Sequence, residues 1–267
     1  MTPDPFADLK KRQREMWASF TPTATFTTPV AGHLVAFACV QAGETVLDVG
    51  TGTGVVAITA ARAGARVSAL DLTPELLEQA RENAAISRQT EVVWTEGDAE
   101  KLPYPDASFD VVLSQFGHMF APRPDVVVAE MHRVLKPKGR IAFATWPPEH
   151  LVGSMFVFVG RNSPPPPPGA SPPAQWGSTA LVAERLAAGF ETPFFERGTM
   201  AFPALSLEHY RLFMERSVGP MQKLVEASAN DPGKLAGLRA EFMALAAPYY
   251  SGNVVHQDYL LTRAQRR

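Results

Sequence analysis

The sequence has little cysteine and no excess of charge of either sign. Cys39 is the only cysteine among 267 residues, which excludes an internal disulfide and a metal site built from several thiolates. Cys39 lies in the apolar run HLVAFACV, which predicts a buried structural thiol rather than a nucleophile. The formal net charge of -2 leaves no surplus of cations for a phosphate backbone, so we expect no nucleic-acid partner.

Long apolar runs are also absent. No stretch approaches the roughly 20 apolar residues that cross a bilayer, so we expect no integral membrane segment. The amino-terminal run MTPDPFADLKKRQREMW mixes charges with prolines and has no apolar core of the kind that a secretory signal needs, which favours a cytoplasmic location. Hydrophobic residues make up 46% of the chain and charged residues 19%, a composition typical of a globular protein with one large core.

From Glu44 onward, short β-branched runs alternate with helical segments, as in βαβ units. The predicted strands, each apolar enough to be buried on both faces, are Glu44–Gly50, Arg66–Asp71, Thr90–Glu96, Phe109–Gln115 and Gly139–Trp146. The helices predicted between them are Val55–Ala63, Pro74–Ile86 with Thr73 as N-cap, and Pro124–Leu135. We therefore expect an α/β, Rossmann-like fold, with a mostly parallel seven-stranded sheet, helices on both faces and a small helical cap.

The flanking segments complete the predicted organisation. Residues 1–43 are expected to form part of a lid from two helices, Ala7–Phe20 and Val30–Val40, joined by a Thr/Pro-rich loop. Residues 44–146 form the core. Residues 147–177 form a proline-rich connection, in which RNSPPPPPGASPPAQWG predicts extended chain without helix, and a stiff spacer is favoured over a docking motif.

Residues 178–267 are expected to complete the sheet around the inserted cap. The predicted helix Ser178–Ala188 precedes two strands, Thr192–Phe202 and Val254–Thr262. The cap helices predicted between these strands are Leu207–Arg216, Met221–Ala229 and Pro232–Ala246.

The run VLDVGTGTG is the strongest indication of function. A predicted strand enters a turn that opens a helix, and Gly50, Gly52 and Gly54 let the backbone turn sharply and approach a ligand closely. Val55 stands where the dinucleotide fingerprint needs its last glycine, and the lysine of a P-loop is missing, so NAD and ATP are disfavoured. The carboxylate of Asp48 would repel a pyrophosphate and attract a ligand with an ammonium group.

Two more acids follow strand ends. Asp71 ends the second predicted strand, about 20 residues after the turn, where a carboxylate can accept hydrogen bonds from both hydroxyls of a ribose. Asp98 follows the third strand, where it can accept a hydrogen bond from an adenine amino group. Each acid alone is better explained as a cap or turn residue, but the ordered set favours a nucleoside site.

The order of VLDVGTGTG, Asp71-Leu72, GDAEKLPYPDASFD and EMHRVLKPKGRIAFATW resembles the class I S-adenosylmethionine (SAM) dependent methyltransferases, in the group of the ubiquinone and menaquinone C-methyltransferases. The resemblance implies SAM as cofactor, S-adenosylhomocysteine (SAH) as product and no metal. It implies that the glycine turn and Asp48 hold the methionine part, Asp71 the ribose, Leu72 the adenine face and Asp98-Ala99 the adenine edge. The whole set expected to contact the cofactor is Asp48, Gly50, Thr51, Gly52, Gly54, Asp71, Leu72, Asp98, Ala99, Ser114, Gln115 and Phe116.

Within the resemblance, one turn departs from the family pattern. The family commonly has a lysine-proline-glycine-glycine turn before the fifth strand, whereas this chain has Lys136-Pro137-Lys138-Gly139. We expect Lys138 to fit a type I turn.

The segment Ser114–Asp125 leaves the carboxyl edge of the sheet and is expected to face the substrate. His118 is the candidate general base, because an imidazole can take a proton from a hydroxyl or an activated carbon, although a loop histidine is more often structural. Phe116 and Phe120 are expected to add an apolar wall with Met119. The residues expected to contact substrate are Trp17, Phe20, His118, Met119 and Trp146.

Other aromatic residues are candidates for the lid and cap, with ordinary core packing as the alternative. They are Phe26 near the amino terminus and Tyr210, Phe213 and the neighbouring Met214 in the cap.

We predict a SAM-dependent methyltransferase that acts on a small, apolar or aromatic metabolite by in-line displacement, because the sulfonium already activates the methyl group. The run SQFG lacks the Asn/Asp-Pro-Pro-aromatic motif that resembles enzymes methylating bases or glutamine, and a single cysteine separates the chain from the arsenic methyltransferases. The alternatives are a non-catalytic SAM-binding or protein-interaction module and a nicotinamide oxidoreductase. Oxygen, nitrogen and carbon acceptors stay open, as does the oligomeric state.

Overall fold

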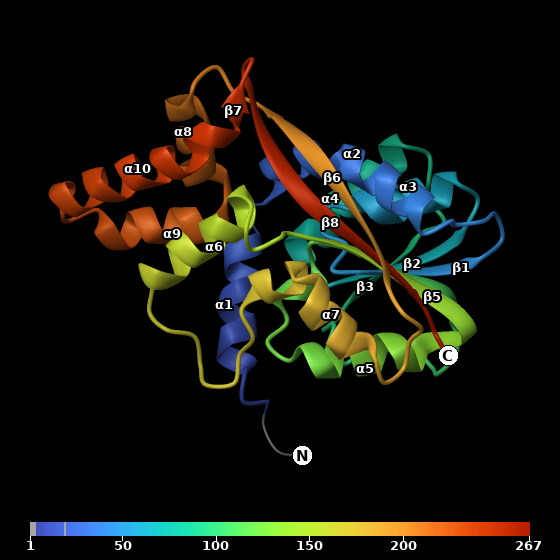
Figure 1. Ribbon diagram of the computed structural model, residues 1–267. Coiled ribbons are helices and arrows are strands. Elements are labelled where there is room, and N and C mark those ends of the chain that lie inside the picture. The colour runs from blue at the N-terminus through green and yellow to red at the C-terminus, as the bar shows by residue number, and fades with distance from the viewer. Residues whose placement is uncertain (1–3, 19) are drawn as a thin grey trace.

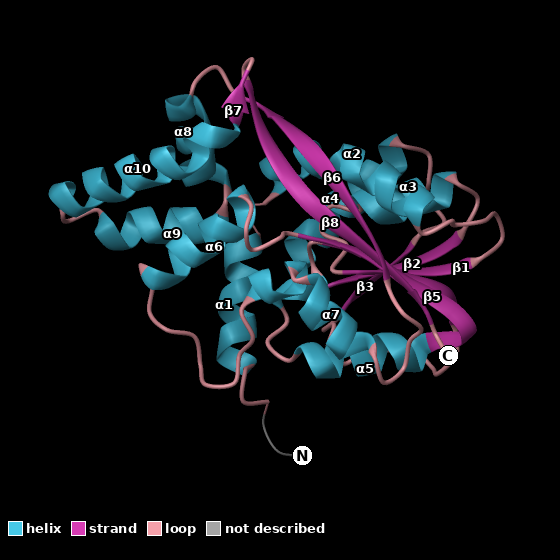
Figure 2. Ribbon diagram, in the orientation of Figure 1, coloured by secondary structure: helices cyan, strands magenta, loops and turns pink. Residues whose placement is uncertain are grey.

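The computed structural model describes residues 4–18 and 20–267. Its centre is one sheet with the strand order β3-β2-β1-β4-β5-β8-β6, and a short strand β7 pairs with β8 (Figure 2). The strands β1 to β5 pair in parallel, whereas β8 pairs antiparallel with β5, β6 and β7. The Rossmann-like fold predicted from the sequence is confirmed, with β7 added to the seven expected strands. The strands are β1 (Thr45–Val49), β2 (Arg66–Asp71), β3 (Val93–Glu96), β4 (Phe109–Gln115), β5 (Leu135–Thr145), β6 (Phe194–Pro203), β7 (Tyr250–Ser251) and β8 (Val254–Gln265).

Helices cover both faces of the sheet, and α8, α9 and α10 project together to one side as the predicted cap (Figure 1). The amino-terminal helices are α1 (Ala7–Trp17) and α2 (Thr21–Phe37). The remaining helices are α3 (Val55–Arg62), α4 (Pro74–Ile86), α5 (Pro124–Val134), α6 (Leu151–Arg161), α7 (Thr179–Leu186), α8 (Leu207–Ser217), α9 (Gly219–Ser228) and α10 (Pro232–Ala246). Short 3-10 helices are η1 (His118–Phe120), η2 (Pro173–Gly177) and η3 (Ala247–Tyr249). No helix in the part of the chain that the structure describes combines the length and apolarity needed to cross a membrane.

Strand β1 marks the point where the strand order reverses, because β2 follows on one side of it and β4 on the other. Ligands of open α/β sheets bind outside the carboxyl ends of the strands at such a point. Val46, Leu47 and Val49 are fully buried, so the start of the glycine turn is fixed to the core. By contrast, β3 lies at the sheet edge and is half-exposed, so the prediction that the third strand is buried on both faces is wrong.

The Thr/Pro-rich segment before residue 30 is helical, which corrects the prediction of a loop. Pro22 lies in the first turn of α2, where its missing N–H costs nothing. Pro29 lies inside α2, where proline removes one backbone hydrogen bond. The helix forms because Ala24, Thr27 and Val30 are buried, so tertiary packing outweighs the poor helix propensity of the segment.

The proline-rich connection contains more helix than the sequence predicts. Helix α6 lies inside residues 147–177, and Pro173–Gly177 forms η2, so the expectation of a wholly extended proline-rich run is wrong. The side chain of Trp176 is almost fully buried, and the Thr145 hydroxyl donates to the Trp176 carbonyl at 2.9 Å. The buried Trp176 therefore packs the end of the proline-rich connection against the sheet.

Two residues with a positive φ also differ from expectation. Cys39 is exposed with a φ of 54°, because α2 ends at Phe37 and the chain turns away from the core. The Arg263 guanidinium donates to its sulfur at 3.0 Å and to the Phe37 carbonyl at 2.7 Å. Lys138 has a φ of 63° and lies within β5, in the stretch between Leu135 and Arg140 where the pairing with β4 shifts register. The expected type I turn before the strand is therefore wrong, and a lysine occupies the left-handed region that glycine favours.

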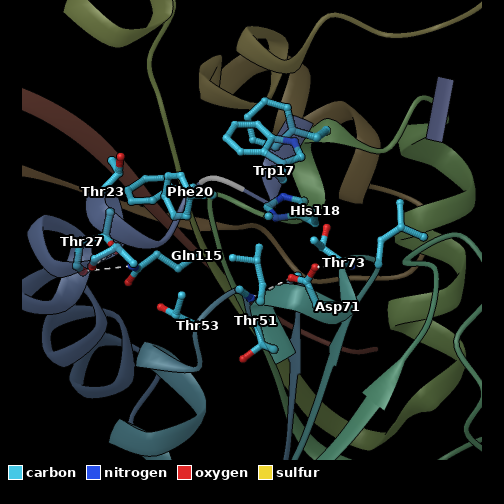
Figure 3. A pocket seen from close by; sticks show the side chains of 18 of the residues that line it. Trp17, Phe20, Thr23, Thr27, Thr51, Thr53, Asp71, Thr73, Gln115 and His118 are labelled. Atoms are coloured by element: carbon cyan, nitrogen blue, oxygen red, sulfur yellow. Dashed lines mark hydrogen bonds between the residues drawn. The ribbon is translucent and has the colours of Figure 1, made fainter. Parts of the chain in front are cut away.

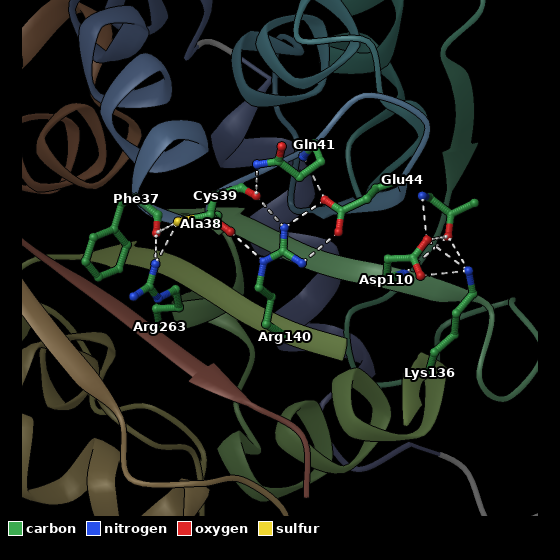
Figure 4. Close-up of polar contacts among 10 residues, drawn as sticks. Phe37, Ala38, Cys39, Gln41, Glu44, Asp110, Lys136, Arg140 and Arg263 are labelled. Atoms are coloured by element: carbon green, nitrogen blue, oxygen red, sulfur yellow. Dashed lines mark hydrogen bonds and ion pairs between the residues drawn. The ribbon is translucent and has the colours of Figure 1, made fainter. Parts of the chain in front are cut away.

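At the amino edge of the sheet, polar contacts fasten the strand starts together (Figure 4). Arg140 of β5 donates to both carboxylate oxygens of Glu44, at 2.8 and 2.7 Å, and this lowers the pKa of Glu44. Lys136 donates to Asp110 of β4, and Asp110 accepts from the Thr45 backbone N–H at 2.8 Å. The polar groups at this edge pair with one another, so we look for a ligand at the carboxyl edge.

Candidate active site

The glycine turn after β1 borders the carboxyl edge of the sheet. Gly50, Gly52 and Gly54 have φ values of 68°, 55° and 84°, which side chains rarely tolerate. A Cβ on Gly50 would lie 2.8 Å from the Gly117 Cα, so the turn packs directly against the backbone that follows β4. A Cβ on Gly54 would lie 2.7 Å from the Trp94 ring, so Gly54 faces the core behind the turn.

A cavity of about 210 Å³ lies above this turn and is closed by α1, α2 and the cap (Figure 3). Most of the site residues predicted from the sequence line it. They are Asp48, Gly50, Thr51, Gly52, Asp71, Leu72, Asp98, Ala99, Gln115, Phe116, Trp17, Phe20, His118 and Trp146. The structure does not bring Gly54, Ser114 or Met119 into the cavity lining.

Asp48 is fully buried beneath the turn. Its Oδ2 accepts hydrogen bonds from the Thr51 hydroxyl at 2.5 Å and from the Ala57 backbone N–H at 3.1 Å. Its Oδ1 has no partner among the described residues. Burial raises the pKa of Asp48 to about 7. One oxygen thus holds the turn in place, and the other remains an acceptor for a donor in the cavity.

Asp71, at the end of β2, joins the second strand to the glycine turn. Its Oδ2 accepts from the Gly52 backbone N–H at 2.7 Å, and its Oδ1 accepts from the Thr73 N–H at 2.9 Å. Burial raises the pKa of Asp71, while these backbone hydrogen bonds oppose the rise. Each oxygen keeps a second lone pair, so the carboxylate is oriented and can still accept from ligand hydroxyls.

Asp98 belongs to a cluster of charges that attaches α1 to the sheet. The Lys10 ammonium donates to Asp98 at 2.6 Å, to Asp4 at 2.7 Å and to Glu100 at 2.5 Å. Burial opposes the charge of Lys10, but the three carboxylates raise its pKa overall. Arg123 contacts the same Glu100 at 2.6 Å. The carboxylates of Asp4, Asp98 and Glu100 lie close enough to surround a cation, and the Lys10 ammonium supplies it.

Lys10 lines the cavity beside Asp98, yet no pattern in the sequence indicates this position. A single lysine in a charged amphipathic run is normally solvated, and only the packing of α1 against the segment after β3 places it here.

The residues at the end of β4 and just after it have two roles: some join neighbouring segments, and some line the cavity. The Ser114 hydroxyl donates to the Val49 carbonyl at 2.6 Å and accepts from the His118 N–H at 3.1 Å, so it joins the ends of β1 and β4. Gln115 lines the cavity, and its Nε2 donates to the Thr27 carbonyl at 3.0 Å (Figure 3). Phe116 stacks on Trp146, with 3.9 Å between the ring centroids.

His118 lies in an apolar environment. Its side chain is 1% exposed, neither ring nitrogen has a hydrogen-bond partner among the described residues, and the ring packs on Phe143 and Trp176 at 4.6 and 4.5 Å. Burial, together with the charge of Arg185, lowers the pKa of His118 to about 3. The imidazole is therefore neutral at pH 7 and a weak base, and the geometry does not support the predicted general-base role.

We expect His118 to make folding stability pH-dependent. The pKa of His118 falls from about 6.5 in the unfolded chain to about 3 in the folded protein, so the folded state favours the neutral ring. The stability that burial of the neutral ring contributes is fully present above pH 6.5 and is lost as the pH falls toward 3. Compared with His118→Gln, the wild type should lose up to about 1.4 kcal/mol of unfolding free energy per pH unit below pH 6.5.

Urea denaturation of both proteins from about pH 7.5 to 4.5 measures this difference. If the difference in unfolding free energy between wild type and His118→Gln does not change with pH, the burial of an uncharged ring is contradicted.

Much of the remaining lining is apolar and comes from the lid, the cap, the connection and β6; we call this apolar part the cap side. Trp17 lies 4.6 Å from Phe120 and 5.5 Å from Phe20, between ring centroids. The cap side consists of Trp17, Phe20, Phe120, Trp146, Val152, Met155, Phe156, Met200, Phe202, Met214 and Val218. The sequence did not predict the residues of α6 and β6 among them, because apolar side chains on such elements look like ordinary core.

Three aromatic candidates pack outside the cavity lining. Phe26 contacts Phe202 and Phe213, with centroids 4.0 and 5.4 Å apart. Tyr210 is fully buried and packs on Phe242 at 5.8 Å. The alternative of core packing therefore holds for Phe26, Tyr210 and Phe213, whereas Met214 lines the cavity.

A doubly wound sheet with a glycine-rich turn at its reversal point, and with acids at the end of β2 and after β3, defines a class I SAM-dependent methyltransferase fold. Comparisons with known proteins agree. The family described as Methyltransferase domain matches residues 47–143. A protein of Mycobacterium tuberculosis without an assigned function is 34% identical over 257 residues, which cover 95% of this chain and 93% of that protein.

A second relative has a named activity. The demethylmenaquinone methyltransferase of Deinococcus radiodurans is 40% identical over 162 residues, which cover 56% of this chain and 67% of that protein. Among solved structures, the YcgJ protein of Bacillus subtilis has the same fold, with a TM-score of 0.59 at 20% identity over 89% of this chain and 97% of that chain. This chain belongs to the class I SAM-dependent methyltransferases, and SAM is its cofactor.

The residues of the strand edge fit this cofactor. Three acids, Asp48, Asp71 and Asp98, line the cavity and complement a ligand that carries a sulfonium and an ammonium group. The Oδ1 of Asp48 has no partner among the described residues, and a Cβ added to Gly52 would meet no atom within 4 Å, so the site offers both an acceptor and open space for a ligand.

Proposed function

We propose that this methyltransferase transfers the SAM methyl group to a small apolar acceptor that carries an aromatic ring. The observation that supports the proposal is the cap side of the cavity, which is made of aromatic, methionine and valine side chains. Aromatic rings pack well against flat ring compounds. The relative named for demethylmenaquinone also supports an apolar, ring-bearing acceptor.

We assign the cofactor to the strand-edge side of the cavity. The turn Gly50–Gly52 and Asp48 hold the methionine part, and Asp71 accepts from the ribose hydroxyls. Leu72, Asp98 and Ala99 contact the adenine. These assignments are supported by the lining of the cavity and by the acceptor capacity that Asp48 and Asp71 keep.

The chain contributes alignment and exclusion of water. When bound, SAM supplies a methyl group that its sulfonium already activates. Trp17 and Phe20 close the cavity from the amino-terminal side, and Phe116 stacked on Trp146 forms a flat wall. Holding an acceptor in one orientation beside the cofactor lowers the entropic part of the barrier to an in-line displacement.

We expect SAH formation with neutral phenols, naphthols or hydroquinones and none with amino acids, phosphoethanolamine or oligonucleotides. The measurement is SAH release by chromatography after incubation with SAM and each acceptor. Trp17→Ala opens the aromatic wall and should raise KM for the ring compounds while SAM affinity stays within about threefold. Turnover confined to charged acceptors would overturn the proposal. Turnover with any acceptor excludes the non-catalytic alternative.

A further inference from the structure

Gln115 lines the cavity and has one buried polar atom that no described residue pairs with. Its Nε2 donates to the Thr27 carbonyl of α2 at 3.0 Å. A backbone carbonyl only accepts hydrogen bonds, so this contact fixes which end of the amide faces α2. Its Oε1 is buried and has no hydrogen-bond partner among the described residues. A buried acceptor left unpaired is destabilising, so a ligand that supplies a donor would bind favourably at this atom.

The neighbouring polar groups on this side of the cavity already have protein partners. The Thr27 hydroxyl donates to the Ala24 carbonyl at 2.8 Å, and the Thr23 hydroxyl donates to the Ser217 carbonyl at 3.2 Å. The Gln257 amide donates to the Tyr210 hydroxyl at 2.9 Å. Among these four side chains, the Gln115 oxygen is the buried atom without a hydrogen-bond partner in the described residues. It is therefore an acceptor that an occupant of this side of the cavity can use, as Asp48 Oδ1 is at the strand edge.

Charges are kept away from the cap side. The ionisable residues that line the cavity, within the described residues, are Lys10, Asp48, Asp71, Asp98 and His118. Lys10 is surrounded by carboxylates, the acids lie at the strand edge, and His118 is neutral at pH 7. A carboxylate or phosphate on the acceptor would find no cation there and would face the partial negative charge of the Gln115 oxygen.

We propose that Gln115 is a specificity-determining residue whose Oε1 accepts a hydrogen bond from an O–H or N–H group of the methyl acceptor. The inference rests on the proposed function, because it assumes that a ring-bearing acceptor fills the cap side. A site built around a buried acceptor rejects an analogue that lacks the donor, because the carbonyl is then left unpaired. The contact therefore selects neutral ring compounds with a hydroxyl or N–H group over isosteric hydrocarbons and over anions.

The test compares two ligands of the same shape. Equilibrium dialysis of SAH-loaded protein with 2-naphthol and 2-methylnaphthalene gives the ratio of their dissociation constants. For Gln115→Met, which keeps the length of the side chain and removes the amide, we expect the ratio to shift about tenfold or more toward 2-methylnaphthalene. A change in packing alone would weaken both ligands alike and leave the ratio unchanged.

Gln41→Met is the matched control. Gln41 also donates through Nε2 to a backbone carbonyl, that of Cys39, at 3.0 Å, but it lies in an exposed loop and not in the cavity lining (Figure 4). The ratio of the two dissociation constants for Gln41→Met should equal that of the wild type. Gln115→Asn, which withdraws the carbonyl but keeps the amide, is the second variant should Gln115→Met fold poorly, and it should shift the ratio in the same direction.

An unchanged ratio in the Gln115 variants, or no binding of 2-naphthol to the wild type, would overturn the inference. These results differ from a failure of the proposed function. If neutral aromatic acceptors are methylated with the same preference by wild type and Gln115 variants, the proposed function stands and the role of Gln115 falls.

Discussion

Gly117→Ala is expected to weaken SAM binding by at least about 100-fold, because the new Cβ has no room against the glycine turn. It would lie 2.5 Å from the Gly50 carbonyl oxygen and 2.7 Å from the Gly50 Cα. Both atoms belong to backbone, so no side chain can move aside, and either the turn or the start of η1 must shift. The turn bears the cofactor in our assignment, so a shift there acts on SAM directly.

Calorimetric titration with SAM measures this effect, and thermal unfolding separates it from a loss of fold. Overpacking of this kind costs about 1–3 kcal/mol of stability. Gly32→Ala is the control, because Gly32 lies in α2 with nothing within 4 Å of its added Cβ. We expect the control to bind SAM as the wild type does. Unaltered SAM affinity in Gly117→Ala would contradict the close approach of the two backbones.

Asp71→Asn is expected to weaken SAM binding by about 10- to 100-fold, because hydrogen bonds to a charged acceptor contribute about 1.5–3 kcal/mol. The amide has one acceptor oxygen in place of two, and its NH₂ group would face the N–H of Gly52 or of Thr73. The variant therefore loses an acceptor for the ribose and disturbs the turn at the same time.

The pH dependence of SAM affinity distinguishes the carboxylate from a general loss of fit. Burial raises the pKa of Asp71 in the folded protein, so the charged acceptor is lost as the pH falls through that raised value. Wild-type affinity should thus fall at acidic pH, and the part of this fall that Asp71 causes should vanish in Asp71→Asn. Asp106→Asn, with a 77% exposed side chain, is the control. Equal SAM affinity in Asp71→Asn and wild type would refute the ribose assignment.

The predictions from sequence succeeded where a local pattern fixes local structure. The glycine spacing needs left-handed backbone, and all three glycines of the turn have positive φ. Alternation of β-branched runs with helical segments gave the parallel strands β1, β2, β4 and β5 near their observed bounds. The acids after β2 and β3 were found because parallel strands bring their carboxyl ends to one edge.

Predictions failed where packing between distant segments decides. The Thr/Pro-rich start of α2 reads as a loop, yet the burial of Val30 and Leu34 makes it helical. Cys39 sits in an apolar run, yet the end of α2 turns it outward. Ser114 near the end of β4 and Met119 after it were expected at the site, but Ser114 joins the ends of β1 and β4, and Met119 is buried outside the cavity lining. Successive side chains of a strand point to opposite faces, so only some of these residues reach the cavity.

The sequence by itself determined the class of protein, since a glycine-rich turn and acids at fixed strand ends are local requirements of a nucleoside bearing a sulfonium. Tertiary structure alone decided the acceptor side. Trp17 of α1, Phe156 of α6, Phe202 of β6 and Met214 of α8 meet around one cavity although they are far apart in the chain. Their contact depends on how the lid, connection and cap pack on the sheet. The same packing gives His118 its low pKa and leaves the Gln115 oxygen without a partner, because burial, and not residue type, sets both.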